Sequence, residues 1–195
     1  MSYKEILTTI AITMTLFAYV PFVRSILRGT IRPHVFSWVI WGATTSIVFF
    51  AQLKDGGGIG AWPIGLSGVT TIGIAILAYL NKSDMTITRL DWIFLFSAFA
   101  SLPVWFFTSD PLWAVIVLTT VDLLGFGPTI RKGYALPFEE DVVFFSIFVV
   151  RNILAMIALE HYSVTTLLFP VAISVSVALF VGMVLWRRRV LAAEG

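Results

Sequence analysis

Long apolar stretches dominate this chain and leave few ways for it to fold. An α-helix needs about 20 largely apolar residues to cross about 30 Å of hydrocarbon. Seven stretches approach or reach that length, with short polar or glycine-rich breaks between them. They are approximately 5–28, 34–53, 59–80, 92–108, 111–132, 141–159 and 163–186. The sequence therefore predicts an all-α membrane protein with seven transmembrane helices.

The composition excludes several classes of protein. Hydrophobic residues make up 58% of the chain and charged residues 12%, with a mean hydropathy of +0.95, which is far from a soluble domain of this size. The absence of cysteine excludes disulfides, thiolate nucleophiles and cysteine-ligated zinc or iron–sulfur clusters. Basic residues are scattered at the ends of apolar stretches instead of forming a stripe, so we expect the lipid bilayer, and no nucleic acid, as a partner.

Basic residues also predict the orientation in the membrane. With seven crossings, Lys4 and Lys54 fall on one face. The opposite face carries Arg24, Arg28, Arg32, Lys82, Arg89, Arg131, Lys132, Arg187, Arg188 and Arg189. Positively charged loops favour the cytoplasmic side. We therefore expect an N-terminus outside and a C-terminus in the cytoplasm, in a bacterial inner (plasma) membrane.

A weak internal repeat suggests a tandem duplication. A shift of 107 residues aligns Pro21 with Pro128, Arg24 with Arg131, Pro63 with Pro170 and Ser67 with Ser174. The same shift places the first three stretches on the last three and leaves the fourth as a linker. An odd linker helix makes two three-helix bundles parallel, a 3+1+3 arrangement. The predicted units are residues 1–80 (first repeat), 81–110 (linker with the fourth helix) and 111–195 (second repeat and basic tail).

Pro21 and Pro128 lie near the inner ends of equivalent predicted helices. A proline inside a helix removes one amide donor and disturbs the carbonyl four residues earlier. In lipid such a carbonyl needs protein or water to satisfy it, so paired prolines suggest hinges that face a shared cavity. Arg24 and Arg131 follow one turn later. Two roles fit them: part of an inner gate, or side chains that simply extend to the membrane surface.

This pattern resembles the SWEET and PQ-loop superfamily of small-solute transporters. The resemblance rests on two parallel three-helix bundles, an outer N-terminus, and the prolines Pro21 and Pro128 near the cytoplasmic ends of equivalent helices. The next residues are Phe22 and Thr129, where that superfamily usually has glutamine. The resemblance implies a central pathway between the bundles, proline-hinged gating and a solute site near mid-membrane.

Asp122 and Arg151 are the two ionisable residues that stand out deep inside predicted spans. At about 1.5 Å per residue, they lie about 16 Å and about 12 Å from the outer ends of their helices, close enough in depth for an ion pair. Such a pair could hold two helices together. Alternatively, Asp122, Arg151 and the neighbouring Asn152 could line a cavity that binds a charged or zwitterionic solute or carries a proton.

The second predicted helix carries an aromatic and hydroxyl stripe. Trp41 lies about a third of the way across, followed by Thr44 and Thr45, the repeat equivalents of Arg151 and Asn152. This stripe could form a wall of the solute site, although small hydroxyl residues also occur at ordinary helix contacts.

The sequence therefore predicts a transporter or facilitator that moves a small polar solute by alternating access, and the solute can be charged or zwitterionic. We expect no cofactor and no catalytic residue. We also expect no metal site, because His34 and His161 fall on opposite membrane faces and cannot share a metal ion. Two alternatives share the scaffold: an intramembrane enzyme or cofactor-binding protein that uses Asp122, and a receptor or assembly factor whose basic tail binds lipid or protein. A single chain and a homo-oligomer both fit the sequence.

Overall fold

Helices account for the regular structure throughout the described part of the chain. The computed structural model describes residues 2–29, 33–82, 85 and 87–194, without the side chains of Pro128, Arg131, Lys132, Glu139 and Glu194. The α-helices are α1 (Tyr3–Leu27), α2 (Val35–Lys54), α3 (Trp62–Leu80), α4 (Arg89–Thr108), α5 (Pro111–Gly125), α6 (Gly127–Ala135), α7 (Val142–Ala158) and α8 (Val164–Glu194). Two short 3₁₀ helices are η1 (Gly58–Ala61) and η2 (Pro137–Glu139). The predicted all-α class is confirmed.

Polar residues at the breaks start the helices. Ser2 begins α1 with a capping box, in which Glu5 N donates to Ser2 Oγ and Ser2 N donates to Glu5. Thr88 and Asp91 form the same arrangement at α4. Asp110 caps α5 in a simpler way, through Leu112 N. These side chains satisfy amide donors that the first turn of a helix leaves free.

Five helices are long and apolar enough to cross a membrane: α1, α2, α3 with η1, α4 and α8. Two further apolar helices, α5 and α7, are shorter, with 15 and 17 residues. Long apolar helices of this kind are consistent with an integral membrane protein. The helix ends lie close to the predicted stretches everywhere except after α5 and α8.

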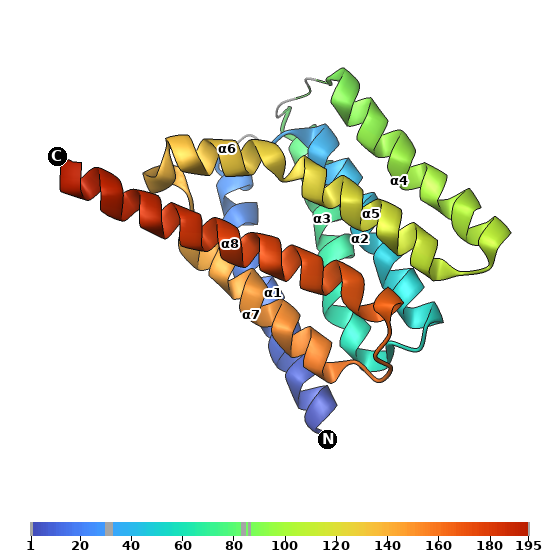
Figure 1. Ribbon diagram of the computed structural model, residues 1–195. Coiled ribbons are helices and arrows are strands. Elements are labelled where there is room, and N and C mark those ends of the chain that lie inside the picture. The colour runs from blue at the N-terminus through green and yellow to red at the C-terminus, as the bar shows by residue number, and fades with distance from the viewer. Residues whose placement is uncertain (1, 30–32, 83–84, 86, 195) are drawn as a thin grey trace.

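The predicted span 111–132 is wrong, because the helix breaks at Phe126. Gly125 ends α5 and Gly127 begins α6, which turns away from the α5 axis (Figure 1). Two glycines and the proline at 128 make a continuous helix unfavourable here. Pro21, the repeat equivalent, lies inside the unbroken helix α1. The two equivalent helices therefore differ, and Asp122 lies in the last turn of α5 instead of halfway along a span.

Two sets of three helices, α1–α3 (the first group) and α5 with α7 and α8 (the second group), share one pattern of internal contacts. In the first group α3 contacts both α1 and α2, and in the second group α8 contacts both α5 and α7. The groups meet where α1 packs against α7 and α2 against α5 (Figure 1). Helix α4 lies outside, against α5 and α2. Close packing of α2 on α3 depends on small residues, since a Cβ added to Gly68 would lie 2.8 Å from Ser46 Oγ.

Candidate functional site

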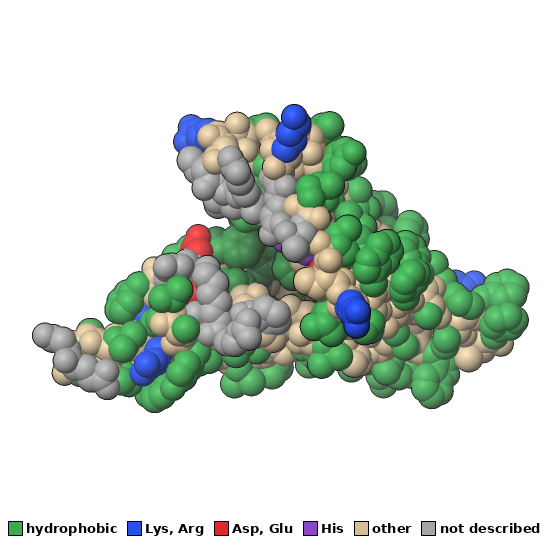
Figure 2. All heavy atoms as spheres, turned by 90° about the horizontal axis from the view of Figure 1, so that it is seen from above, with side chains coloured by type: hydrophobic (Ala, Val, Ile, Leu, Met, Phe, Trp, Pro, Cys, Tyr) green, Lys and Arg blue, Asp and Glu red, His purple; other side chains and the backbone are tan. Residues whose placement is uncertain are grey.

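A cavity of about 710 Å³ lies between the two helix groups. All six helices of the groups contribute to its lining. The cavity reaches the end of the molecule that carries α6 and the start of α7, here called the α6 end, where Glu140 and Asp141 form part of its lining. Figure 2 shows this face hollowed, with apolar side chains inside and an acidic side chain at the rim.

Most of the predicted site residues lie at this cavity. Asp122, Arg151, Asn152, Trp41 and Thr45 line it. Pro21, a predicted hinge, also belongs to the lining. Thr44 is fully buried, and its hydroxyl donates a 3.1 Å hydrogen bond to the carbonyl of Trp41. Arg24, a predicted gate residue, is exposed and is not part of the described lining. The side chains of Pro128 and Arg131 lie outside the described residues.

Arg151 is held by contacts from three helices. Its side chain is 4% exposed, and Nη2 donates a 2.7 Å hydrogen bond to Oγ of Ser67 on α3. The guanidinium lies over the Phe148 ring, 4.9 Å from its centroid. Tyr19 on α1 packs edge-on against the same ring, with centroids 5.5 Å apart. Nε of Arg151 is buried and has no hydrogen-bond partner, so much of the donor capacity of this guanidinium is unused.

Asp122 and Arg151 form no ion pair with each other. The neighbour of the Asp122 carboxylate is the hydroxyl of Thr44 on α2, and Oδ1 of Asp122 is buried without a hydrogen-bond partner. Of the two alternatives that the sequence left open, the direct ion pair is therefore not formed. Instead, two opposite charges lie in the wall of one cavity, and each has unused hydrogen-bonding capacity.

Three residues that organise the site are not among those predicted from the sequence: Ser67, Tyr19 and Phe148. Ser67 accepts from Arg151, while Tyr19 and Phe148 build the aromatic support behind the guanidinium. The repeat alignment drew attention to Ser67 as the partner of Ser174, but it did not indicate a contact with Arg151. A contact between helices so far apart in sequence leaves no trace in hydropathy or spacing.

Aromatic rings cover much of the remaining lining. Trp41 packs edge-on against Trp38, with centroids 5.6 Å apart, and Phe22 packs on Trp38 at 4.9 Å. On the other side, Phe126 and Phe145 face each other at 6.3 Å. The polar side chains of the cavity are therefore set in an aromatic wall.

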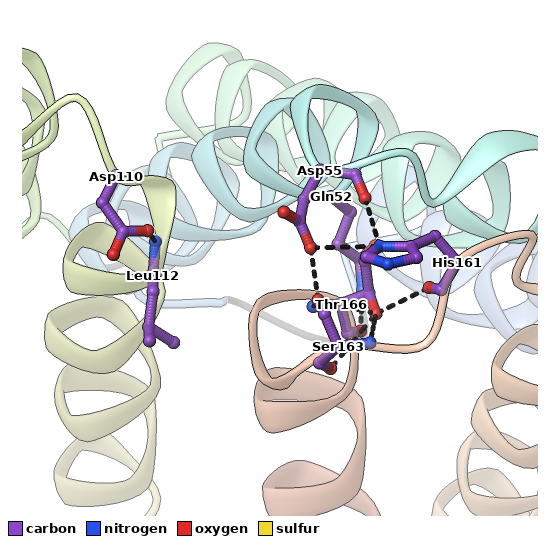
Figure 3. A network of polar contacts seen from close by, with 7 residues as sticks. All are labelled: Gln52, Asp55, Asp110, Leu112, His161, Ser163 and Thr166. Carbon is purple, nitrogen blue, oxygen red and sulfur yellow. Dashed lines mark hydrogen bonds and ion pairs between the residues drawn. The ribbon is translucent and has the colours of Figure 1, made fainter.

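The opposite end of the molecule is joined by the loops at 55–61 and 159–163, here called the loop end. The Asp55 carbonyl accepts a 2.9 Å hydrogen bond from Nδ1 of His161, and the Asp55 carboxylate accepts from Ser163 Oγ. Figure 3 shows these contacts beside Gln52, whose Nε2 donates to the Thr166 carbonyl at 2.7 Å. A Cβ added to Gly60 would collide with the backbone of the facing loop. The two groups are thus connected at the loop end by side chains and by close backbone contact.

The basic tail is the C-terminal part of α8, and it contacts the segment that leads to the cavity mouth. Arg188 Nε donates to the Pro137 carbonyl at 3.0 Å, and its Nη2 donates to the Glu140 carbonyl at 2.8 Å. Arg187 lies over the ring of Tyr134, 4.9 Å from its centroid. Two of the three tail arginines therefore bind the segment 134–140, and Arg189 is exposed.

Within the described residues, no three histidine, aspartate or glutamate side chains gather into a candidate metal site. His34 caps α2 at the α6 end, whereas His161 lies at the loop end. No protein-family model, curated protein sequence or solved structure matches the chain.

Proposed function

We propose that this chain is a membrane transporter or facilitator that moves a small polar, charged or zwitterionic solute by alternating access between the two helix groups. One observation carries the proposal: Asp122 and Arg151 line a single cavity between the groups without neutralising each other. Buried charged side chains are costly, and in membrane proteins they generally mark a solute or ion pathway. The function requires only the solute and the lipid bilayer as partners.

In this proposal all seven apolar helices cross the membrane, in the 3+1+3 arrangement of the SWEET and PQ-loop superfamily. The common packing order of the two groups, with the third long helix between the other two, supports a duplication. The position of α4 outside both groups fits a linker. Helices α5 and α7 measure about 22 Å and about 26 Å at 1.5 Å per residue, and a bilayer adapts to such short spans by local thinning.

The charge asymmetry of the sequence supports a cytoplasmic α6 end and an outer loop end, which we propose for a bacterial inner membrane. The cavity then opens inward, while the contacts of Asp55, His161 and Ser163 close the outer side. Alternating access requires the loop end to separate as the α6 end closes. Pro21 and Pro128 are the proposed hinges, with Arg24 and Arg131 as candidates for an inner gate.

Solute counterflow into proteoliposomes tests transport. The panel contains neutral sugars, amino acids, carboxylates and nucleosides, each as a radiolabelled tracer. Arg151→Gln and Asp122→Asn should lower the flux of the transported solute to background. Arg89→Gln and Asp110→Asn change exposed residues of the same types and should retain it. If the unmodified chain carries no solute of any class, transport is wrong.

Single cysteines in this naturally cysteine-free chain test the seven crossings. We expect a membrane-impermeant maleimide to label Lys54→Cys and Glu160→Cys in intact spheroplasts. Lys82→Cys and Ala135→Cys should react only after permeabilisation. Labelling of Ala135→Cys and Glu160→Cys from the same side would show that α7 does not cross, and the 3+1+3 arrangement would be abandoned.

A further inference from the structure

Two opposite charges with unused hydrogen-bonding capacity share one cavity. Arg151 makes a hydrogen bond to Ser67, and its Nε has no partner. Asp122 has Thr44 as its polar neighbour, and its Oδ1 has no partner. The adjacent Asn152 also belongs to the lining and is 5% exposed. One wall therefore offers donors to an anionic group, and another offers acceptors to a cationic group.

A solute that carries both a positive and a negative group would bind Arg151 and Asp122 at the same time. A charge removed from water is costly unless an opposite charge and hydrogen bonds compensate it. Asp122 and Arg151 do not compensate each other. A solute with a carboxylate alone would leave Asp122 uncompensated, and an amine alone would leave Arg151 uncompensated. A solute with both groups compensates the charge of Asp122 and the charge of Arg151.

The aromatic side chains of the cavity indicate that the solute also has an apolar or ring-shaped part. The lining of the cavity includes the aromatic residues Trp41, Phe126, Phe144, Phe145 and Phe148. Rings of this kind favour a partner that buries apolar area or stacks edge to face. The cavity of about 710 Å³ is large enough for a ring as well as for the charged groups.

We propose that the solute is a ring-bearing zwitterion, an aminocarboxylate of the size of an aromatic amino acid. Its carboxylate binds Arg151 and Asn152, and its ammonium binds Asp122 beside Thr44. The ring lies against the aromatic wall. This inference rests on the proposed function, because it specifies the occupant of the same cavity.

Three matched probes test the charges: L-phenylalanine, N-acetyl-L-phenylalanine, which lacks the cation, and L-phenylalanine methyl ester, which lacks the anion. Affinity is measured by equilibrium binding to the purified chain, with L-alanine as a probe without a ring. We expect the dissociation constant of phenylalanine to be at least about tenfold lower than that of each other probe. Each of those probes lacks either one charge-assisted hydrogen bond or the ring contact.

Substitutions should change the preference in opposite directions. With Asp122→Asn, N-acetyl-phenylalanine should bind as well as phenylalanine, because the ammonium has lost its partner. With Arg151→Gln, the methyl ester should bind as well as phenylalanine. A misfolded variant would bind phenylalanine and both blocked probes equally weakly. A folded Asp122→Asn variant should still discriminate against the methyl ester, and a folded Arg151→Gln variant should still discriminate against N-acetyl-phenylalanine. Equal binding of all three probes by the unmodified chain, or no change of preference in either variant, would overturn the inference.

Flux measured on the same preparations separates this inference from transport. Counterflow of a sugar or a nucleoside that persists in Arg151→Gln would overturn the zwitterion and retain transport. Tight binding of phenylalanine with no flux of any solute would retain the zwitterion site and overturn transport.

Discussion

Arg151 on α7 donates a 2.7 Å hydrogen bond to Ser67 on α3, so the two helix groups are joined inside the cavity wall. Ser67 uses its own proton to bind the Pro63 carbonyl at 3.0 Å. The lone pairs of its hydroxyl are then available to the guanidinium. Ser67 is therefore a positioning residue, which acts on the proposed solute through Arg151.

Replacement of this acceptor should weaken solute binding. A hydrogen bond to a charged group contributes about 1.5–3 kcal/mol, so Ser67→Ala should raise the dissociation constant of the transported solute by about tenfold or more. Ser174→Ala is the matched control, since its repeat-equivalent hydroxyl is buried without a partner. Equilibrium binding measures both variants. Equal affinities would show that Ser67 does not position Arg151.

The helices of this fold could be predicted from the sequence, but the contacts between them could not. Apolar length and the polar breaks locate the seven apolar helices to within a few residues, except at the C-terminal ends of α5 and α8. Gly125 and Gly127 indicate the interruption at Phe126. The apolar stretch continues through these residues, however, so hydropathy alone predicts one uninterrupted helix. Which residues face each other is a different matter. Ser67 and Arg151 are 84 positions apart, and their contact depends on how α3 and α7 are placed.

In the candidate site, too, the residues could be predicted from the sequence but their contacts could not. Burial cost alone singled out Asp122 and Arg151, and the structure brings both to one cavity with Asn152 and Trp41. Their roles there stay predictions. Of the two alternatives for these residues, the direct ion pair is not formed: Asp122 has Thr44 as its polar neighbour, and Arg151 has Ser67. Sequence depth gives the level of a side chain in the membrane and says nothing about the direction in which it points.

A covalent link at the loop end should stop transport. The Asp55 carboxylate and the Ser163 hydroxyl are in hydrogen-bond contact, so the double variant Asp55→Cys, Ser163→Cys should form a disulfide on oxidation. If this end must open, flux should fall to background with oxidant and return with reductant. Each single-cysteine variant serves as the control and should not respond. Full flux through the oxidised double variant would show that the loop end is not a gate.

Pro21→Ala should slow the transport cycle. The substitution restores an amide donor to the Phe17 carbonyl, and one helix hydrogen bond contributes about 0.5–1.5 kcal/mol. A stiffer α1 should lower turnover by about two- to tenfold and raise the melting temperature slightly. Pro103→Ala is the matched control, because Pro103 also lies inside a helix but is not part of the described lining. Flux and thermal stability are measured together. Equal turnover in both variants would exclude Pro21 as a hinge.

Arg188 should hold the cavity mouth in shape, and its removal should loosen the segment that carries Glu140. Its two hydrogen bonds to the Pro137 and Glu140 carbonyls each contribute about 1 kcal/mol at this partly exposed position. In Arg188→Ala, amide hydrogen exchange across residues 136–141 should therefore quicken by about tenfold or more. Arg189→Ala changes the exposed neighbour on the same helix and should leave this exchange unchanged. If the tail serves mainly to bind anionic lipid, the two variants should weaken attachment to anionic vesicles alike, and exchange at 136–141 should not distinguish them. A difference confined to Arg188 would assign the tail to the mouth of the cavity.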